Sequence, residues 1–154
     1  MNILINYPHL TAIKRKTLSM PVRWLEEHNL LCGRILDFGC GYGFDTDKLK
    51  QMGYNVQGYD NYYRPTHPEG KFDTIICIYV LNVLEELDRA EVLETVKYYL
   101  KDGGKAYFAV RRDLKKEGFR YHPIQKKYTF QCNVTLPYCS LIANRSFELY
   151  EFKA

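Results

Sequence analysis

The sequence has no long apolar run, and no stretch approaches the roughly 18 consecutive apolar residues that a membrane span needs. It has no internal repeat or low-complexity segment, which excludes a repeat array. The start, residues 1–10, has no basic leader and no small-residue cleavage site, and Pro8 and His9 interrupt it. We therefore expect a cytoplasmic protein with no membrane span and no secretory signal.

Cysteine pairs at metal-binding spacing are also missing. The cysteines are odd in number, none of them forms a C-x-x-C pair, and two lie in or beside apolar runs typical of buried strands. This pattern argues against a zinc site and favours reduced thiols in a cytosolic protein. The five cysteines are Cys32, Cys40, Cys77, Cys132 and Cys139.

Strand and helix patterns alternate along the middle of the chain. Apolar strands are predicted at 34–38, 55–60, 72–83 and 105–110, and helices at 44–52 and 88–100. Another helix is predicted from about Ser19 to Asn29, and two strands near 138–143 and 146–152 form a final hairpin. This order predicts an α/β fold with a mostly parallel, Rossmann-like sheet, helices on both faces and an antiparallel hairpin at the C-terminal edge.

The length of 154 residues suits one domain with a real hydrophobic core and leaves no room for a second. We divide this single domain, 1–154, into a helical segment at 1–33, a ligand-binding core at 34–111 and a segment at 112–154 that ends in the hairpin. The hydrophobic content of 46% is ordinary for a globular protein. The formal net charge of +4 permits an anionic partner without requiring one.

The first strand of the core ends in a glycine loop that opens into a helix. Gly39, Gly41 and Gly43 follow that strand. Such a turn is expected to put unpaired backbone N–H groups and the positive end of a helix dipole beside a ligand. Asp60 ends the next strand, 21 residues after Gly39, where a carboxylate usually holds ribose hydroxyls. These features predict a ribose-containing ligand, either a dinucleotide or S-adenosylmethionine (SAM).

The charge beside the loop distinguishes these two ligands. Asp37 precedes the first glycine by two residues, and Asp45 and Asp47 lie in the first helical turn. Three carboxylates would repel a pyrophosphate and attract the ammonium and sulfonium groups of SAM, so we expect SAM rather than NAD. Alternatively, Asp45 and Asp47 only complement the helix dipole, and Asp60 only ends its strand in a turn. Cys40 is interpreted as a small space-filling thiol.

The residues ILDFGCGYG at 35–43 resemble the first signature motif of class I SAM-dependent methyltransferases. FDTI at 72–75 resembles the start of that family's fourth strand, and DGGK at 102–105 resembles its turn into the fifth. The resemblance covers about residues 34–111. About a dozen residues separate Asp60 from Phe72, too few for the usual helix and third strand, so we predict a shortened sheet without the usual acidic adenine contact.

The resemblance also implies roles for individual residues. Asp37 would orient the methionine amino group, Asp60 would hold the ribose, and Asn61 would lie near the adenine. Tyr79 and Val80 would face the methyl-transfer site, because ligands of such sheets lie beyond the carboxyl ends of the strands. The expected cofactor contacts are Asp37, Gly39, Cys40, Gly41, Asp60, Asn61, Tyr62, Tyr79 and Val80.

A narrower resemblance concerns three other segments. Residues 11–22, 59–65 and 80–83 are similar to the methyltransferases associated with DNA phosphorothioation gene sets. Those relatives are larger, so this chain would correspond to their catalytic domain. The similarity implies no established substrate.

Catalytic residues are weakly indicated, because methyl transfer from a sulfonium mainly requires alignment of the acceptor and, where needed, removal of its proton. Tyr79 and His122 are the candidates, although a lone histidine near a proline is more often incidental. Residues 78–81 lack the Asn/Asp-Pro-Pro-aromatic signature of adenine amino-methyltransferases, which argues against adenine N6 chemistry.

The acceptor stays open between a nucleic acid and a small molecule. Basic and aromatic residues interleave in 111–131, and a second basic cluster lies at 14–16. Nucleic-acid surfaces have this composition, and so does a solvated, loosely packed connection. An inactive binding module in a nucleic-acid-processing complex is the alternative to an enzyme. The candidate nucleic-acid contacts are Lys14, Arg15, Lys16, Arg111, Arg112, Lys126 and Lys127.

Overall fold

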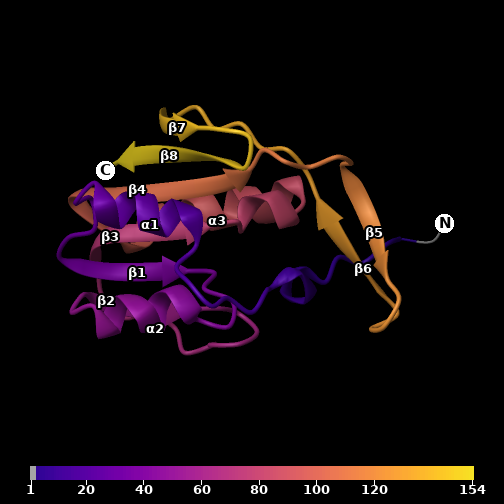
Figure 1. Ribbon diagram of the computed structural model, residues 1–154, viewed down its shortest axis with the longest axis horizontal. Helices are drawn as coiled ribbons and strands as arrows, with labels where there is room; N and C mark the ends of the chain where they lie inside the picture. The colour runs from indigo at the N-terminus through magenta and orange to yellow at the C-terminus, as the bar shows by residue number, and fades with distance from the viewer. Residues whose placement is uncertain (1–2) are drawn as a thin grey trace.

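A six-stranded sheet in the order β2-β1-β3-β4-β8-β7 forms the centre of the computed structural model, which describes residues 3–154 (Figure 1). Strands β1 to β4 pair in parallel, and β8 pairs antiparallel with both β4 and β7. The strands of this sheet are β1 (Arg34–Phe38), β2 (Asn55–Tyr59), β3 (Phe72–Ile78), β4 (Leu100–Arg111), β7 (Cys139–Ala143) and β8 (Phe147–Lys153). The predicted α/β class, mostly parallel sheet and antiparallel C-terminal hairpin are confirmed.

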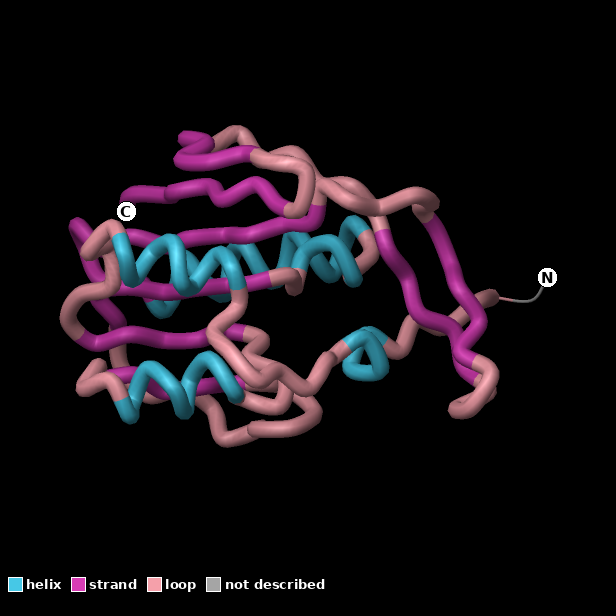
Figure 2. Tube along the Cα trace, viewed as in Figure 1, coloured by secondary structure: helices cyan, strands magenta, loops and turns pink. Residues whose placement is uncertain are grey.

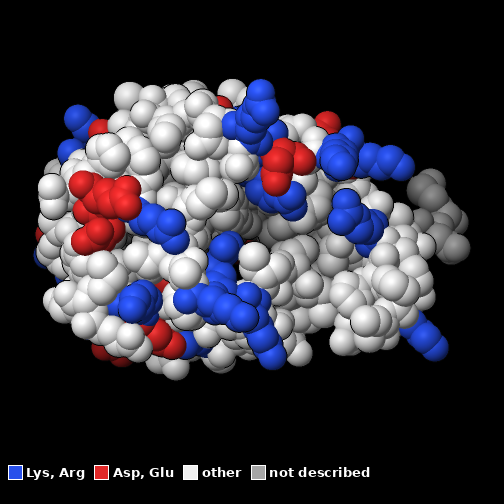
Figure 3. All heavy atoms as spheres, viewed as in Figure 1, with Lys and Arg blue, Asp and Glu red and all other residues white. Residues whose placement is uncertain are grey.

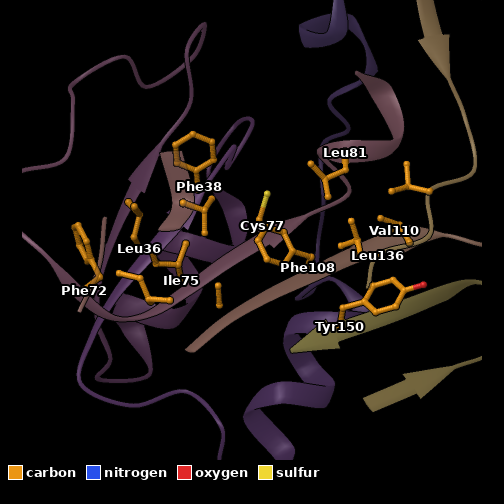
Figure 4. Packing of buried hydrophobic residues seen from close by; sticks show 14 of the residues in the cluster. Leu36, Phe38, Phe72, Ile75, Cys77, Leu81, Phe108, Val110, Leu136 and Tyr150 are labelled. Carbon is orange, nitrogen blue, oxygen red and sulfur yellow. The ribbon is translucent and has the colours of Figure 1, made fainter. Parts of the chain in front are cut away.

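Three α-helices cover the two faces of the sheet. They are α1 (Met20–Glu27), α2 (Phe44–Gln51) and α3 (Glu86–Tyr99). Side chains of α1 and α2 share one buried cluster with Ile35, Ile76 and Tyr107. The other cluster packs against α3 and includes Leu36 and Phe108 (Figure 4). Alternate residues of each strand therefore serve opposite faces, as the pleat of a sheet covered on both sides requires.

The sheet is shortened where the third strand of the family would lie, as predicted. β2 is the edge strand, and the chain returns from it to β3 through residues 60–71 without a helix. The expected strand at 72–83 is too long, because β3 ends at Ile78 and Leu81–Val83 form a short 3-10 turn, η2. Residues 81–83 are buried, which explains why the apolar run continues past the strand.

The turn expected at 102–104 is instead part of β4. That strand begins at Leu100, directly after α3, and its register with β3 shifts between the pairs Phe72–Leu100 and Thr74–Lys105. The expected strand at 105–110 therefore begins five residues earlier, with an irregularity where the two glycines lie.

The segment with the weakest sequence pattern forms a second sheet rather than a loose connection. Strands β5 (Gly118–His122) and β6 (Lys127–Gln131) pair antiparallel and lie beyond the carboxyl ends of the parallel strands (Figure 2). Asn6 fastens this hairpin: its Oδ1 accepts from the Phe130 N–H at 3.0 Å, and its Nδ2 donates to the Val83 carbonyl at 2.7 Å. The chain between Asn6 and α1 contains a 3-10 turn, η1 (Pro8–Thr11).

Residues 3–154 lack two features, a membrane-spanning helix and a metal-binding cluster. None of the helices there has the length and apolar character needed to cross a membrane. The same residues contain no group of three or more His, Cys, Asp and Glu side chains placed to hold a metal ion.

Candidate functional site

A cleft of about 1080 Å³ lies at the carboxyl ends of β1 to β4, between the sheet, the N-terminal segment and β6. Figure 3 shows a hollow near the middle of this face, with Lys and Arg side chains on two opposite sides. All nine residues expected to contact the cofactor line the cleft. A pocket at this position is where ligands of open α/β sheets bind.

Gly39 makes the sharp turn out of β1. Its φ of +77° is a left-handed conformation, and a Cβ added there would lie 2.4 Å from Val80 Cγ2. A side chain at this position is therefore opposed by both backbone strain and collision. The loop consequently passes close to the end of β3, where Val80 and Tyr79 line the cleft.

The amides of the glycine loop are paired inside the protein. The N–H groups of Gly39 and Cys40 donate to the Tyr59 carbonyl at 2.7 and 3.0 Å, and the Gly41 N–H donates to Asp60 Oδ2 at 3.0 Å. The expectation of unpaired N–H groups is wrong at these three positions, because β2 and its terminal aspartate supply the acceptors. The loop therefore lacks, at these positions, the free amides that would cradle a pyrophosphate.

Asp37 lies under the loop and is 3% exposed. Thr46 Oγ1 donates to Asp37 Oδ2 at 2.8 Å. The pKa of Asp37 is raised to about 7, mainly because the carboxyl group is buried and also because of the nearby negative charge of Asp45. Asp45 also lines the cleft and accepts from the N–H and hydroxyl of Ser19 at 2.8 and 2.7 Å, which ties the start of α1 to α2.

The sequence left open whether Asp60 contacts a ligand or only forms a turn after its strand. It lines the cleft, and it also forms a turn in which Oδ1 accepts from the N–H groups of Tyr62 and Tyr63, both at 2.9 Å. With the Gly41 N–H on Oδ2, three of about four acceptor sites of the carboxylate are used within the protein. About one site is left for a ligand, so Asp60 shapes the loop as much as it could hold a ribose.

The carboxylate of Asp47 does not line the cleft. Arg64 binds both of its oxygens, at 2.8 and 2.7 Å, and this hydrogen bonding lowers the pKa of Asp47. Arg64 also donates to the Tyr42 carbonyl at 3.0 Å. Asp47 therefore supports the loop from outside, and nothing in the sequence pattern indicated Arg64 as its partner.

Tyr79 follows β3 with a φ of +59°, a strained conformation for a non-glycine residue, and its N–H donates to the Ala109 carbonyl at 2.9 Å. Burial raises the pKa of its hydroxyl to about 12. The hydroxyl therefore keeps its proton at neutral pH and can donate a hydrogen bond. Burial likewise raises the pKa of Cys40 to about 12, in keeping with a thiol that only fills space.

The other catalytic candidate, His122, is not among the residues that line the cleft. Its Nδ1 pairs with the Gln125 N–H at 3.2 Å, in the turn between β5 and β6. Of the seven basic residues named as candidate nucleic-acid contacts, only Arg15 and Arg111 line the cleft. Arg112 instead binds Glu148, Tyr150 and the Val134 carbonyl, and its side chain is 21% exposed.

Amide side chains that the sequence analysis missed complete the cleft. Asn82 is 1% exposed, lines the cleft and donates from Nδ2 to Gln131 Oε1 at 3.1 Å. Asn82 Oδ1 is buried without a hydrogen-bond partner among the described residues. The signal available in the sequence was one polar residue within the apolar run after β3.

A family model described as a methyltransferase domain matches residues 12–143. The chain belongs to this methyltransferase domain family. The match includes β1, the glycine loop, Asp60 and the end of β3, so the part of the cleft at the carboxyl ends of these strands lies within the matched residues. No curated protein matches the chain.

Several solved structures resemble this chain. One, described for the conversion of a disulfide bond into a thioacetal group during echinomycin biosynthesis, is 25% identical with a TM-score of 0.52, and the match covers 62% of this chain and 51% of that chain. The chain therefore spans about half the length of that protein.

Two further structures match over more of their own length. The glycopeptide N-methyltransferase MtfA is 13% identical with a TM-score of 0.58, covering 85% of this chain and 88% of that chain. The 1,6-didemethyltoxoflavin-N1-methyltransferase of Burkholderia thailandensis, with bound 1,6-didemethyltoxoflavin and S-adenosylhomocysteine, is 14% identical with a TM-score of 0.60, covering 87% and 76%. At these identities the likeness shows a shared fold.

Proposed function

We propose that this protein is an enzyme that binds SAM in the cleft and transfers its methyl group to an acceptor. The observation that carries the proposal is the combination of a glycine loop with internally paired amides and three carboxylates at the same end of the cleft. These are Asp37, Asp45 and Asp60. A pyrophosphate would meet negative charge without compensating N–H groups from residues 39–41, whereas a cationic cofactor is attracted.

The residues present fit SAM. The carboxylates of Asp37 and Asp45 suit the ammonium and sulfonium charges, and Asp60 retains an acceptor site for a ribose hydroxyl. Asn61 and Tyr62 line the cleft and would lie near the adenine, where the third strand is missing. Solved relatives named with bound S-adenosylhomocysteine or SAM support the same cofactor.

When bound, SAM would supply a methyl carbon on a positively charged sulfur, and that sulfur would keep the electron pair of the C–S bond when the acceptor takes the methyl group. The chain's own residues then have to align the acceptor and exclude water. Tyr79 would donate a hydrogen bond to the acceptor; it lines the cleft, and its raised pKa keeps the hydroxyl protonated, which supports this role. The narrower resemblance to phosphorothioation-associated methyltransferases stays a prediction.

Calorimetry tests the cofactor. SAM or S-adenosylhomocysteine should bind the purified chain with micromolar Kd at pH 8, and NADH should bind much more weakly. The isosteric variant Asp37→Asn retains an oxygen for the Thr46 hydroxyl. It should weaken binding by about tenfold or more, since about 1.4 kcal/mol of attraction is a modest value for charges a few ångströms apart.

Three results would contradict this assignment: no heat with millimolar cofactor, tighter binding of NADH, or unchanged affinity in Asp37→Asn. The inactive-module alternative predicts cofactor binding without turnover. Methyl transfer from labelled SAM by the purified chain would eliminate that alternative.

A further inference from the structure

The cleft has a second, differently charged region. Arg15 and Arg111 line it, and among the described residues they are the only Lys or Arg side chains that do. Arg15 precedes α1, and its guanidinium carbon lies 5.8 Å from the centre of the Tyr79 ring. Arg111 ends β4. The two guanidinium groups thus come from separate elements of one cleft.

The sheet order separates Arg111 from the cofactor end. Asp37 lies in β1 and Asp60 follows β2, whereas β4 is two strands away from β1 with β3 between them. Tyr79, at the end of β3, lies between these regions in the strand order. A ligand that extends from the methyl-transfer position toward β4 therefore moves away from Asp37 and Asp60 and meets Arg111.

Both guanidinium groups retain free donors. Arg15 makes no hydrogen bond or ion pair within residues 3–154. Arg111 uses only Nε, which donates to Asp113 Oδ1 at 2.7 Å, and this pair is open to solvent, with side-chain exposures of 37% and 49%. Arginine presents a planar set of donors that matches a carboxylate or phosphate.

We infer that the acceptor of this methyltransferase is a small molecule with a carboxylate or phosphate group, held by Arg111 and Arg15 beside Tyr79. The inference rests on the proposed function and specifies the substrate class of the same site. The two arginines would bind one anionic group of the acceptor, whereas the carboxylates at the other end of the cleft attract the positively charged cofactor.

A nucleic-acid strand fits the same surface less well. Asp88 and Glu91 also line the cleft and would repel successive phosphates. Arg112 is not available to a phosphate in the same way, because it donates a hydrogen bond to Glu148. Lys127 lies over the ring of Tyr7, 4.6 Å from its centre, and does not line the cleft.

The experiment titrates the chain, saturated with S-adenosylhomocysteine, with three probes of similar shape: benzoate, phenyl phosphate and the neutral benzamide. Amide chemical-shift changes in NMR give the Kd values. Benzoate or phenyl phosphate should bind at least about tenfold more tightly than benzamide, because each pairs with a guanidinium. The stronger of the two anions identifies the group. Arg111→Gln should abolish the preference, and Lys116→Gln, an exposed change outside the cleft, should leave it intact.

Equal binding of benzamide, or an unchanged preference in Arg111→Gln, would overturn the inference. Displacement of benzoate by a single-stranded DNA of about 12 nucleotides, with steep salt dependence, would replace it with a nucleic-acid acceptor. Weakened S-adenosylhomocysteine binding in Arg15→Gln, with benzoate binding intact, would overturn the two-arginine arrangement. Failure of the wild type to bind S-adenosylhomocysteine refutes the proposed function instead, and the anion preference is then measured without it.

Discussion

Cofactor binding should release a proton, because the buried carboxyl group of Asp37 has a pKa of about 7 before a cation arrives. At that pKa the group is about 90% protonated at pH 6, about half protonated at pH 7 and about 10% protonated at pH 8. A bound ammonium or sulfonium favours the ionised form and lowers the pKa. Binding should therefore release about 0.9, 0.5 and 0.1 protons at these three pH values.

The affinity follows the same equilibrium. Only the ionised carboxylate attracts the cofactor, so the Kd should weaken by a factor approaching ten for each pH unit below 7. Other charges set the pKa of Asp37 as well: Asp45 and Asp60 raise it, while Arg64 and the Thr46 hydroxyl lower it. These groups act in the free and bound protein alike, so the release depends on the cofactor's own charge.

Titration calorimetry with S-adenosylhomocysteine measures the effect directly. The apparent binding enthalpy, determined in buffers of different ionisation enthalpy, gives the number of protons released from its slope. Asp37→Asn is the matched control, because it cannot titrate and should bind weakly with no such slope. A wild-type slope of zero at pH 6, or equal affinities at pH 6 and pH 8, would refute the reasoning.

Three further predictions concern stability. The first concerns Asp37→Asn, which should become more stable than the wild type as pH rises from about 4 to 7. The folded wild type keeps the Asp37 proton up to about pH 7, whereas its unfolded chain releases that proton near 3.8. In urea unfolding, the free energy of unfolding of the variant should exceed that of the wild type by at most about 4 kcal/mol. Gly39→Ala should lower the free energy of unfolding by about 2–4 kcal/mol, through backbone strain and the collision of the new Cβ with Val80. Gly53→Ala also has a positive φ but no atom within 4 Å of the new Cβ, so it should lower that free energy by only about 1–2 kcal/mol. Equal losses in the two variants would exclude a contribution from the collision. Arg112→Ala should lower the free energy of unfolding by about 2–3 kcal/mol, because it removes charged hydrogen bonds from a partly buried network. Arg111→Ala removes only a solvent-exposed ion pair and should lower it by less than about 1 kcal/mol. Thermal melts compare the two variants, and a larger loss in Arg111→Ala would contradict this prediction.

The sequence allowed the fold to be predicted where structure depends on local periodicity. The apolar run of β1, the glycines after it and the alternating pattern of α2 lie within 18 consecutive residues, and each reports on its own neighbourhood. The spacing from Gly39 to Asp60 placed both residues at one edge of the sheet, because β1 and β2 are parallel neighbours whose carboxyl ends coincide. The segment between Asp60 and Phe72 is likewise too short for a helix and a strand, which predicted that the family's third strand is absent.

The site's chemistry was less accessible, because it depends on partners that local patterns do not encode. The acceptors of the loop amides come from the end of β2, and Arg64 reaches back to Asp47 across 17 positions. The hairpin of β5 and β6 has half-exposed strands with weak alternation of buried and exposed residues, so no clear strand period is visible in this part of the sequence.

The sequence by itself determined the strands and helices of the six-stranded sheet, the glycine turn and the row of aspartates, since each follows from side-chain type and spacing. Tertiary structure alone decided that the loop amides are already paired, that Asn6 is hydrogen-bonded to Phe130 across 124 positions, and that His122 lies apart from the cleft which Arg111 lines. The reason is physical: hydrogen bonds and charge pairs between distant segments form only after the hydrophobic core has fixed where those segments meet.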